Sequence, residues 1–315
     1  MMARFRQNCW FEPALIALII IIIGLVLPST YYFRIATLVL IAGLSATGLN
    51  LLLGYAGQIS LGHAGFVGIG AYAVAVLPAK FAVPSLLAIF CGTLVSGVVA
   101  LIIGRPILRL KDHFLAVATL AFGILIAMVL NNEQWLTGGP DGMAVSRIEL
   151  FGIRIRSAQS WYWISGTVLV LAVVLARNLL DSSTGRALRA LHDSEVAARS
   201  AGIDVARIKS IVFVISAVFA SLSGSLYALF NGHVTPDIAS FLNSIEIVTM
   251  VVLGGMGSLS GGLVGAVILV VLPQALSFFH EYEHLLLGVL MILILVFMRA
   301  GIVPTLAARW ARGRL

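Results

Sequence analysis

Ten apolar stretches, separated by short polar or turn-forming segments, run along the chain. A helix needs about 20 apolar residues to cross the hydrocarbon core of a bilayer, and most of these stretches approach that length. The pattern therefore predicts about ten membrane-spanning helices, over residues 11–28, 35–53, 59–77, 85–104, 115–130, 161–176, 210–230, 244–256, 262–279 and 285–298.

Two of these stretches differ from the others. Residues 59–77 are rich in glycine, and residues 244–256 are too short to cross a bilayer alone. Irregular backbone is tolerated at membrane depth only where protein or a water-filled cavity surrounds it. We expect one or both of these segments to be broken or re-entrant.

Composition supports a membrane protein. Of the 315 residues, 60% are hydrophobic and 10% are charged, whereas a soluble domain carries roughly 25% charged residues. Too few polar groups remain to cover a water-facing surface, so the excess apolar area must face lipid. No polar segment is long enough to form a separate soluble domain. We expect an all-α polytopic bundle, with a single transmembrane domain over residues 1–315.

The basic residues indicate the orientation of the chain. With ten crossings, segments on the side of the N-terminus contain fifteen of the 20 Lys and Arg residues, and the opposite segments contain five. Because basic residues concentrate in cytoplasmic loops, both termini are expected in the cytoplasm. This distribution accounts for the net charge of +7, and no nucleic-acid partner is expected. Arg4 and Arg6 precede the first stretch as in a signal peptide, but no small-residue cleavage site follows, so we expect an uncleaved first span.

Two polar segments are long enough to fold outside the membrane. Residues 131–160 are predicted to lie outside and contain a turn-rich stretch, LTGGPDG, at 136–142. Residues 178–209 are predicted to lie inside as a helix, capped by Thr184, with Glu195 facing Arg199 at i,i+4 and Gly202 at its end. Such a helix could lie on anionic lipid. However, its small residues and its lack of a Trp, Phe or Leu wedge favour the close approach of a partner protein.

This inner segment resembles the coupling helix of ABC-importer permeases, which carry a Glu-Ala-Ala-x-x-x-Gly pattern that docks into the ATPase subunit. Ala197, Ala198 and Gly202 match this pattern. Val196 occupies the position of the glutamate, and Glu195 lies one residue earlier. The departure suggests a divergent subfamily.

Further motifs indicate which subfamily it is. They are GLNLLLGYAGQISLGHAGF at 48–66, FLAVATL at 114–120, TGGPDG at 137–142, GRALR at 185–189 and VLGGMGS at 252–258. These blocks resemble the permeases of branched-chain amino acid importers, and more closely the longer of the two permease subunits. They occur in the family order and cover most of the chain from 40 to 275.

The resemblance implies a type II importer bundle in the inner membrane, with the solute path at the interface of two permeases. The implied partners are a homologous permease as heterodimer, two ABC ATPases that bind ATP and magnesium, a periplasmic solute-binding protein and membrane lipid. The chain itself is expected to bind no cofactor. Branched-chain amino acids are the implied solutes, with urea, short amides or another small organic solute as the alternative. The residues expected to couple the permease to the ATPase are Arg189, Asp193, Glu195, Ala197, Ala198, Arg199 and Gly202.

Polar residues inside the apolar stretches are candidates for the solute path, because they are costly in a membrane unless paired or wet. They are Asn50, Gln58, Ser60, His63 and Glu246. For the first four, hydrogen bonding between helices is an equal alternative. The carboxylate of Glu246 could pair with a basic group, hold the ammonium of an amino acid or relay protons, or it could lie at the outer interface. In the last arrangement His233 and Asp237 would form part of an outer vestibule; with Asp141 they are candidates for docking the binding protein.

No catalytic or metal-binding set stands out, so an enzyme is not expected. The sequence LSGG at 259–262 imitates an ABC ATPase signature, but the chain contains no Walker A motif. Cys9 and Cys91 fit no metal or redox spacing. A stand-alone channel or secondary transporter is the main alternative to an importer subunit, and it would transport without a partner ATPase.

Overall fold

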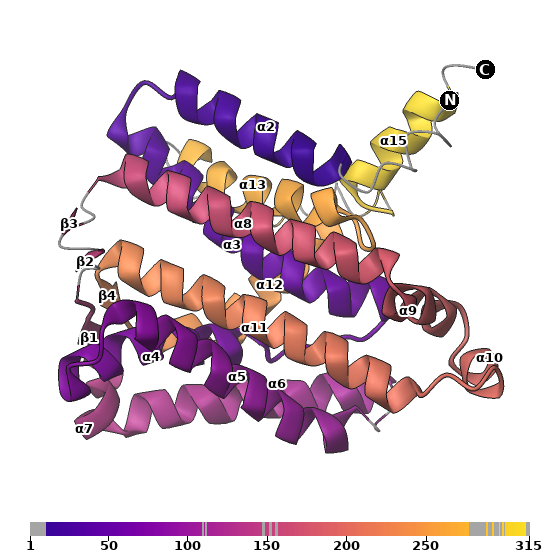
Figure 1. The fold of residues 1–315 in the computed structure, drawn as a ribbon, viewed down its shortest axis with the longest axis horizontal. Helices are drawn as coiled ribbons and strands as arrows, with labels where there is room; N and C mark the ends of the chain where they lie inside the picture. Colours follow the sequence, from indigo (N-terminus) through magenta and orange to yellow (C-terminus); the bar gives the residue numbers. More distant parts are fainter. Residues whose placement is uncertain are drawn as a thin grey trace.

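Long apolar helices lie side by side and roughly parallel in the computed structural model (Figure 1). The structure describes residues 11–108, 110, 112–146, 149–150, 153–154, 157–276, 288, 292, 296, 298 and 300–312. Within these residues the fold is an all-α bundle, as predicted. The only strands described are two-residue pairs outside the long helices.

Each of the first nine predicted spans corresponds to a helix. These are α2 (Phe11–Val26), α3 (Thr30–Asn50), α4 (His63–Phe81), α5 (Ser85–Ile107), α6 (Asp112–Asn132), α8 (Ala158–Asp181), α11 (Val205–Asn231), α12 (Phe241–Gly254) and α13 (Leu259–Leu276). Among the described residues, six helices are long and apolar enough to cross a membrane, and α2, α12 and α13 are shorter apolar helices. Most of the tenth predicted span, 285–298, lies outside the described residues.

Helix α5 shows how small residues allow the helices to pack. Its buried positions form a stripe at every fourth residue, namely Ala88, Gly92, Ser96, Ala100 and Gly104. Small side chains on one face let neighbouring helices approach closely, which is the main source of attraction between helices in lipid. The opposite face of α5 exposes large apolar side chains such as Phe90, Leu94 and Ile102. This face is suited to contact lipid.

The expectation of a break within the glycine-rich stretch 59–77 is wrong, because α4 runs without interruption from His63 to Phe81 and the irregular backbone lies before it. Helix α3 continues into a π-helical turn, η1 (Leu51–Tyr55), and the chain is then non-helical until α4 begins at His63. Part of this connection is buried inside the bundle, at Gln58, Ser60 and Gly62, and Gly62 lies against Thr119 of α6, whereas Gly57 and Ile59 are exposed. Side chains satisfy its backbone: the Leu61 N–H donates to Thr119 Oγ1 at 3.1 Å and the Ala64 N–H donates to Ser244 Oγ at 3.1 Å.

Helix α12 is too short to cross the membrane alone, as predicted. Its 14 residues extend about 21 Å at 1.5 Å per residue, less than the ~30 Å hydrocarbon core. A turn at 255–258 then leads into α13, which returns antiparallel to α12: Gly254 lies next to Gly261, and Met250 lies next to Gly265. The two short helices form a hairpin.

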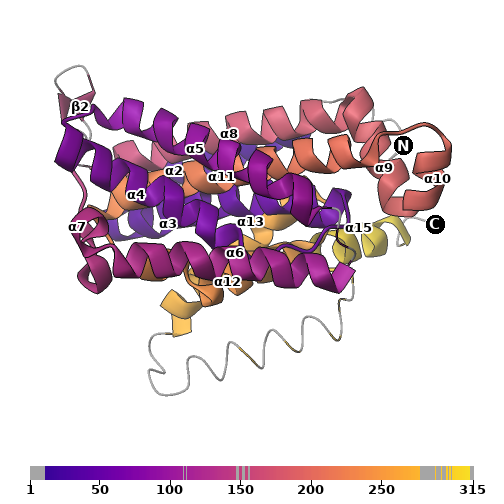
Figure 2. The ribbon, with the colours of Figure 1, turned by 90° about the horizontal axis from the view of Figure 1, so that it is seen from below.

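The segments outside the long helices gather at two opposite ends of the bundle (Figures 1 and 2). One end contains α9 (Ser183–Asp193), α10 (Glu195–Ser200) and α15 (Ile302–Arg312). The other end contains α7 (Gln134–Thr137), η2 (Gly139–Asp141), β1 (Met143–Ala144), β2 (Glu149–Leu150), β3 (Ile153–Arg154), β4 (His233–Val234) and η3 (Pro236–Ala239). Strand β1 pairs antiparallel with β4 and β2 with β3. The polar segments predicted on opposite sides of the membrane therefore lie at opposite ends. We call the end with α9 and α10 the inner end and the end with the β-strands the outer end, after the predicted orientation of the chain.

The prediction of a single helix between α8 and α11 is wrong in detail. The chain forms two helices, α9 and α10, and they are separated at Ser194. Ser194 has an extended backbone and its side chain accepts a hydrogen bond from the Ala197 N–H, so it starts a new helix. Helix α9 follows Ser182, not Thr184, as its N-cap residue. Gly202 ends α10 as predicted, with φ of +80°.

Candidate functional site

A cavity of about 560 Å³ opens between α3, α11, α12 and the η3 segment, toward the end with the β-strands. A volume of about 300–1,000 Å³ is typical of sites for small molecules. Much of its wall is hydrocarbon, from residues that include Leu38, Ile41, Val67, Ile247 and Met250. The cavity can therefore accommodate an apolar solute of small size.

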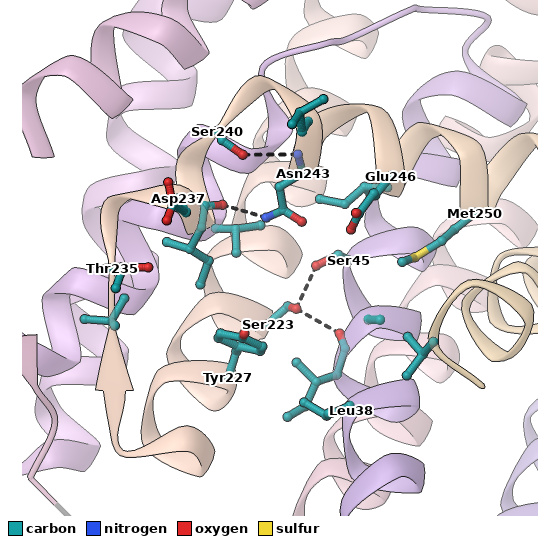
Figure 3. Close-up of a pocket in the computed structure, with 18 of the residues that line it drawn as sticks. Leu38, Ser45, Ser223, Tyr227, Thr235, Asp237, Ser240, Asn243, Glu246 and Met250 are labelled. Carbon is teal, nitrogen blue, oxygen red and sulfur yellow. Dashed lines mark hydrogen bonds between the residues drawn. The ribbon is translucent and has the colours of Figure 1, made fainter. Parts of the chain in front are cut away.

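Polar groups line the rest of this cavity (Figure 3). Ser45 Oγ donates a 2.7 Å hydrogen bond to Ser223 Oγ, and Ser223 Oγ donates one of 2.8 Å to the Ile41 carbonyl, so α3 and α11 are joined at its floor. Asn243 Nδ2 donates to the Ile238 carbonyl at 2.6 Å and holds η3 against α12. These bonds fix the walls of the cavity.

Glu246 projects from α12 into the same space, with its carboxylate directed toward Ser45 in Figure 3. Among the described residues it forms no ion pair, and no Lys or Arg lines the cavity. It lies five residues after Phe241, the first residue of α12, or about 8 Å along the helix. The structure thus places it near the outer end of a half-length helix, on a cavity wall.

The three residues predicted to dock a binding protein lie together at the outer end. His233 Nε2 lies 3.2 Å from the Asp141 carbonyl oxygen, across the pairing of β1 with β4. Asp237 lies in η3 at the rim of the cavity. All three residues are exposed. Glycines at 138, 139 and 142, each with positive φ, form the turn that positions Asp141.

The other predicted path residues lie away from this cavity. Asn50 is fully buried; its Nδ2 donates to the Ser258 carbonyl at 2.6 Å and its Oδ1 accepts from the Gly257 N–H at 3.0 Å. It therefore holds the turn between α12 and α13. His63 is equally buried, with Nδ1 2.8 Å from Ser60 Oγ and Nε2 2.6 Å from Ser216 Oγ. These contacts correspond to the alternative of hydrogen bonding between helices.

Gln58 differs from these residues. It is one of the buried residues of the connection before α4 and is 3% exposed. Neither its Nε2 nor its Oε1 has a hydrogen-bond partner among the described residues. A buried amide without a partner is costly, so Gln58 is the one member of this group whose polar atoms remain available.

At the inner end, Glu195 joins two helices. Its carboxylate accepts from Arg199 at 2.7 Å, the predicted i,i+4 pair, and from Lys209 of α11 at 2.9 Å. The hydrogen bond from Lys209, more than the other contacts, lowers the pKa of Glu195. Lys209 was missed from the sequence because the turn at 201–204 brings it back onto α10. An acid fourteen residues from a base gives no helical spacing to detect.

The remaining predicted coupling residues fall into two groups. Asp193, Ala197, Arg199 and Gly202 are exposed and could face a partner. Ala198 is only 2% exposed, because it packs between Leu191 and Val205. Val196, two residues before Ala198 on the same helix, is 80% exposed. Arg189 donates to the Leu180 carbonyl at 3.0 Å and ties α9 to the end of α8.

Apolar helices long enough to span a membrane line an outer cavity, and the short helices α9 and α10 lie at the inner end. Together with the family match, this arrangement defines the chain as a multi-pass membrane transport protein rather than an enzyme. Residues 31–295 match the family described as the permease component of branched-chain amino acid transport systems, and the chain belongs to that family. This confirms the resemblance carried by the sequence motifs. It also places the chain in the inner membrane.

Individual relatives support the same assignment. The chain is 34% identical over 294 residues to the high-affinity branched-chain amino acid transport system permease protein LivM of Escherichia coli, which covers 86% of this chain and 69% of the relative. It is 28% identical over 304 residues to LivH of the same organism, covering 89% of this chain and 92% of the relative. The higher identity to LivM, the longer relative, agrees with the sequence prediction. A fructose import permease protein, FrcC of Rhizobium meliloti, is 28% identical over 228 residues, or 68% of this chain and 62% of the relative.

Proposed function

We propose that this chain is one permease subunit of an ATP-driven importer and that its solutes are branched-chain amino acids. The observation that carries the proposal is the family match over 31–295 together with 34% identity to LivM. The apolar wall of the outer cavity supports a solute with a hydrocarbon side chain. The presence of a fructose import permease among the relatives makes the solute, rather than the family, the point to test.

The chain works with partners in this proposal. A homologous permease completes a heterodimer, which fits the existence of two kinds of relative, LivM and LivH. Two ABC ATPases bind ATP and magnesium and supply the energy, and a soluble binding protein delivers the solute to the outer end. The permease itself binds no cofactor.

Helix α10 is proposed to transmit movement of the ATPases. It is only six residues long and exposes Val196, Ala197 and Arg199. The Lys209–Glu195 ion pair joins it to α11, the helix that also contributes Ser223 and Tyr227 to the outer cavity. A force on α10 would therefore reach a wall of the cavity through one continuous helix.

Reconstitution tests the proposal. The chain, its partner permease, both ATPases and the binding protein, co-reconstituted in liposomes, are expected to accumulate leucine only when ATP is present. Uptake by the chain alone would contradict the importer assignment and support a channel or secondary transporter. Uptake of urea or short amides, but not leucine, would retain the importer and change its solute.

Substitutions on α10 test the coupling. Val196→Glu places a charge on the most exposed apolar position of α10 and is expected to reduce co-purification of the ATPases without changing the apparent Tm of the permease. Ala198→Leu is the matched comparison. It leaves the exposed surface of α10 unchanged in charge and instead disturbs the buried contact of Ala198 with Leu191 and Val205. Unchanged ATPase binding in both variants would count against α10 as the coupling element.

A further inference from the structure

We infer that the outer cavity is itself selective for solutes with an ammonium group, and that the carboxylate of Glu246 binds that group. The inference rests on the proposed function and deepens it. It assigns part of the solute recognition to this permease, in addition to the selectivity of a binding protein.

The charges along the cavity favour a cationic solute. Among the described residues, Glu246, Asp237, His233 and Tyr227 are the titratable groups that line it, and no Lys or Arg does. Neither carboxylate has an ion-pair partner among the described residues. An acidic cavity with low-polarity walls attracts cations and repels anions, and its walls strengthen that preference.

The two carboxylates differ in their position relative to the cavity. Glu246 points into the cavity, whereas Asp237 points away from Ser45 and Ser223 (Figure 3). Asp237 also lines a second, outer hollow of about 310 Å³ between α6 and η3. Of the two carboxylates, Glu246 is therefore the one placed against a solute inside the larger cavity.

The surroundings of Glu246 fit the rest of an amino acid. Ile247, Met250 and Ile41 provide an apolar wall for a branched hydrocarbon chain. Tyr227 and Thr235 also line the cavity, and their hydroxyls donate to no other described residue, so they remain available to the solute carboxylate. A charged anchor beside an apolar wall, with few polar groups, is the usual composition of a small-molecule site.

Three ligands separate the chemical groups that the cavity recognises. Leucine carries ammonium and carboxylate, 3-methylbutylamine keeps the ammonium and lacks the carboxylate, and 4-methylpentanoate keeps the carboxylate and lacks the ammonium. The purified permease heterodimer in detergent would be heated with each ligand at about 10 mM, enough to fill a site with a Kd near 1 mM. Leucine and 3-methylbutylamine are expected to raise the apparent Tm, and 4-methylpentanoate is not.

Three variants assign the effect to Glu246. Glu246→Gln has nearly the same shape without the charge, and it is expected to weaken the binding of leucine and of the amine by about tenfold or more, as for loss of one charge-assisted contact. Glu246→Asp keeps the charge and should retain part of the effect. Asp237→Asn, which removes the second carboxylate of the same cavity, should weaken the binding of both ligands less than Glu246→Gln does, because Asp237 points away from Ser45 and Ser223 (Figure 3).

Any of three results would overturn the inference: no ligand raises the apparent Tm, 4-methylpentanoate acts as well as the amine, or Glu246→Gln retains the full effect. Uptake of leucine by the reconstituted importer is measured in parallel. If uptake is normal and the ligand effects are absent, the recognition by Glu246 fails and the proposed function stands. If the ligand effects are present and ATP-dependent uptake is absent, the proposed function fails instead.

Discussion

The ammonium group of Lys209 lies 2.9 Å from the carboxylate of Glu195, and this contact fixes the short helix α10 to the long helix α11. The Lys209 side chain is 11% exposed, whereas Arg199, the other partner of the same carboxylate, is 68% exposed. One carboxylate therefore takes part in two ion pairs in very different surroundings. Their energies should differ accordingly.

Removing the carboxylate leaves the Lys209 ammonium nearly buried without a partner. We expect Glu195→Gln to lower the free energy of unfolding by about 1–2 kcal/mol, less than for a fully buried pair because Glu195 is itself partly exposed. Arg199→Ala, the matched control, should cost at most about 0.5 kcal/mol because its ion pair is exposed. Apparent Tm in detergent measures both, and equal losses would contradict the assignment of the stronger contact to Lys209.

The same pair predicts a dependence on pH. The hydrogen bond from Lys209 holds the pKa of Glu195 below its ordinary value of about 4.5. A lowered pKa in the folded protein adds stability that is complete above the unfolded pKa and is lost as pH falls through the folded pKa. The difference in apparent Tm between the unchanged protein and Glu195→Gln should therefore be constant near neutral pH and shrink below about pH 4.5. A difference that grows in acid would refute it.

Glycines at helix contacts give a prediction in which two substitutions have opposite signs. A Cβ on Gly224 of α11 would overlap the backbone carbonyl of Val67 in α4, which cannot move aside independently. Gly224→Ala is expected to cost about 1–3 kcal/mol, as for an overpacked core. A Cβ on Gly97 of α5 would lie 3.5 Å from Val218 Cγ2, an ordinary contact. Gly97→Ala should therefore raise the free energy of unfolding by up to about 1 kcal/mol through helix propensity. The apparent Tm in detergent measures both variants, and a change of the same sign in the two would contradict the prediction.

The sequence predicted the nine described spans because each is an apolar stretch whose length is a local property. The irregular backbone was expected within 59–77 and lies instead before α4, at 56–62, where the glycines and polar residues of 54–63 interrupt the apolar pattern. The separation of α9 from α10 was missed, although Ser194 followed by Glu195 is a pattern typical of a helix start. The i,i+4 pair of Glu195 with Arg199 is the same in one helix or in two, so it could not distinguish them.

The cavity could not be predicted in the same way. It joins Ser45 of α3, Ser223 of α11 and Glu246 of α12, and the two serines are 178 residues apart in the sequence. Polar residues were selected as candidates from the sequence, because each is costly in a membrane without a partner. Which of them meet was determined by the helix arrangement. Glu246 faces the cavity, whereas Asn50 bonds to the turn between α12 and α13 and His63 bonds to Ser216 of α11.

Asn50 provides a direct test of that distinction. Asn50→Leu removes the donor to the Ser258 carbonyl and the acceptor for the Gly257 N–H, and each unsatisfied buried group costs about 1–3 kcal/mol. We therefore expect the substitution to lower the apparent Tm markedly and to reduce transport only in proportion to the folded protein. Thr47→Val is the control on the same helix, because Thr47 is buried and donates only to the Gly43 carbonyl, four residues earlier; it should cost less than about 1 kcal/mol. If Asn50→Leu instead retains its apparent Tm and loses leucine uptake, Asn50 lines the solute path, and the turn at 255–258 does not depend on it.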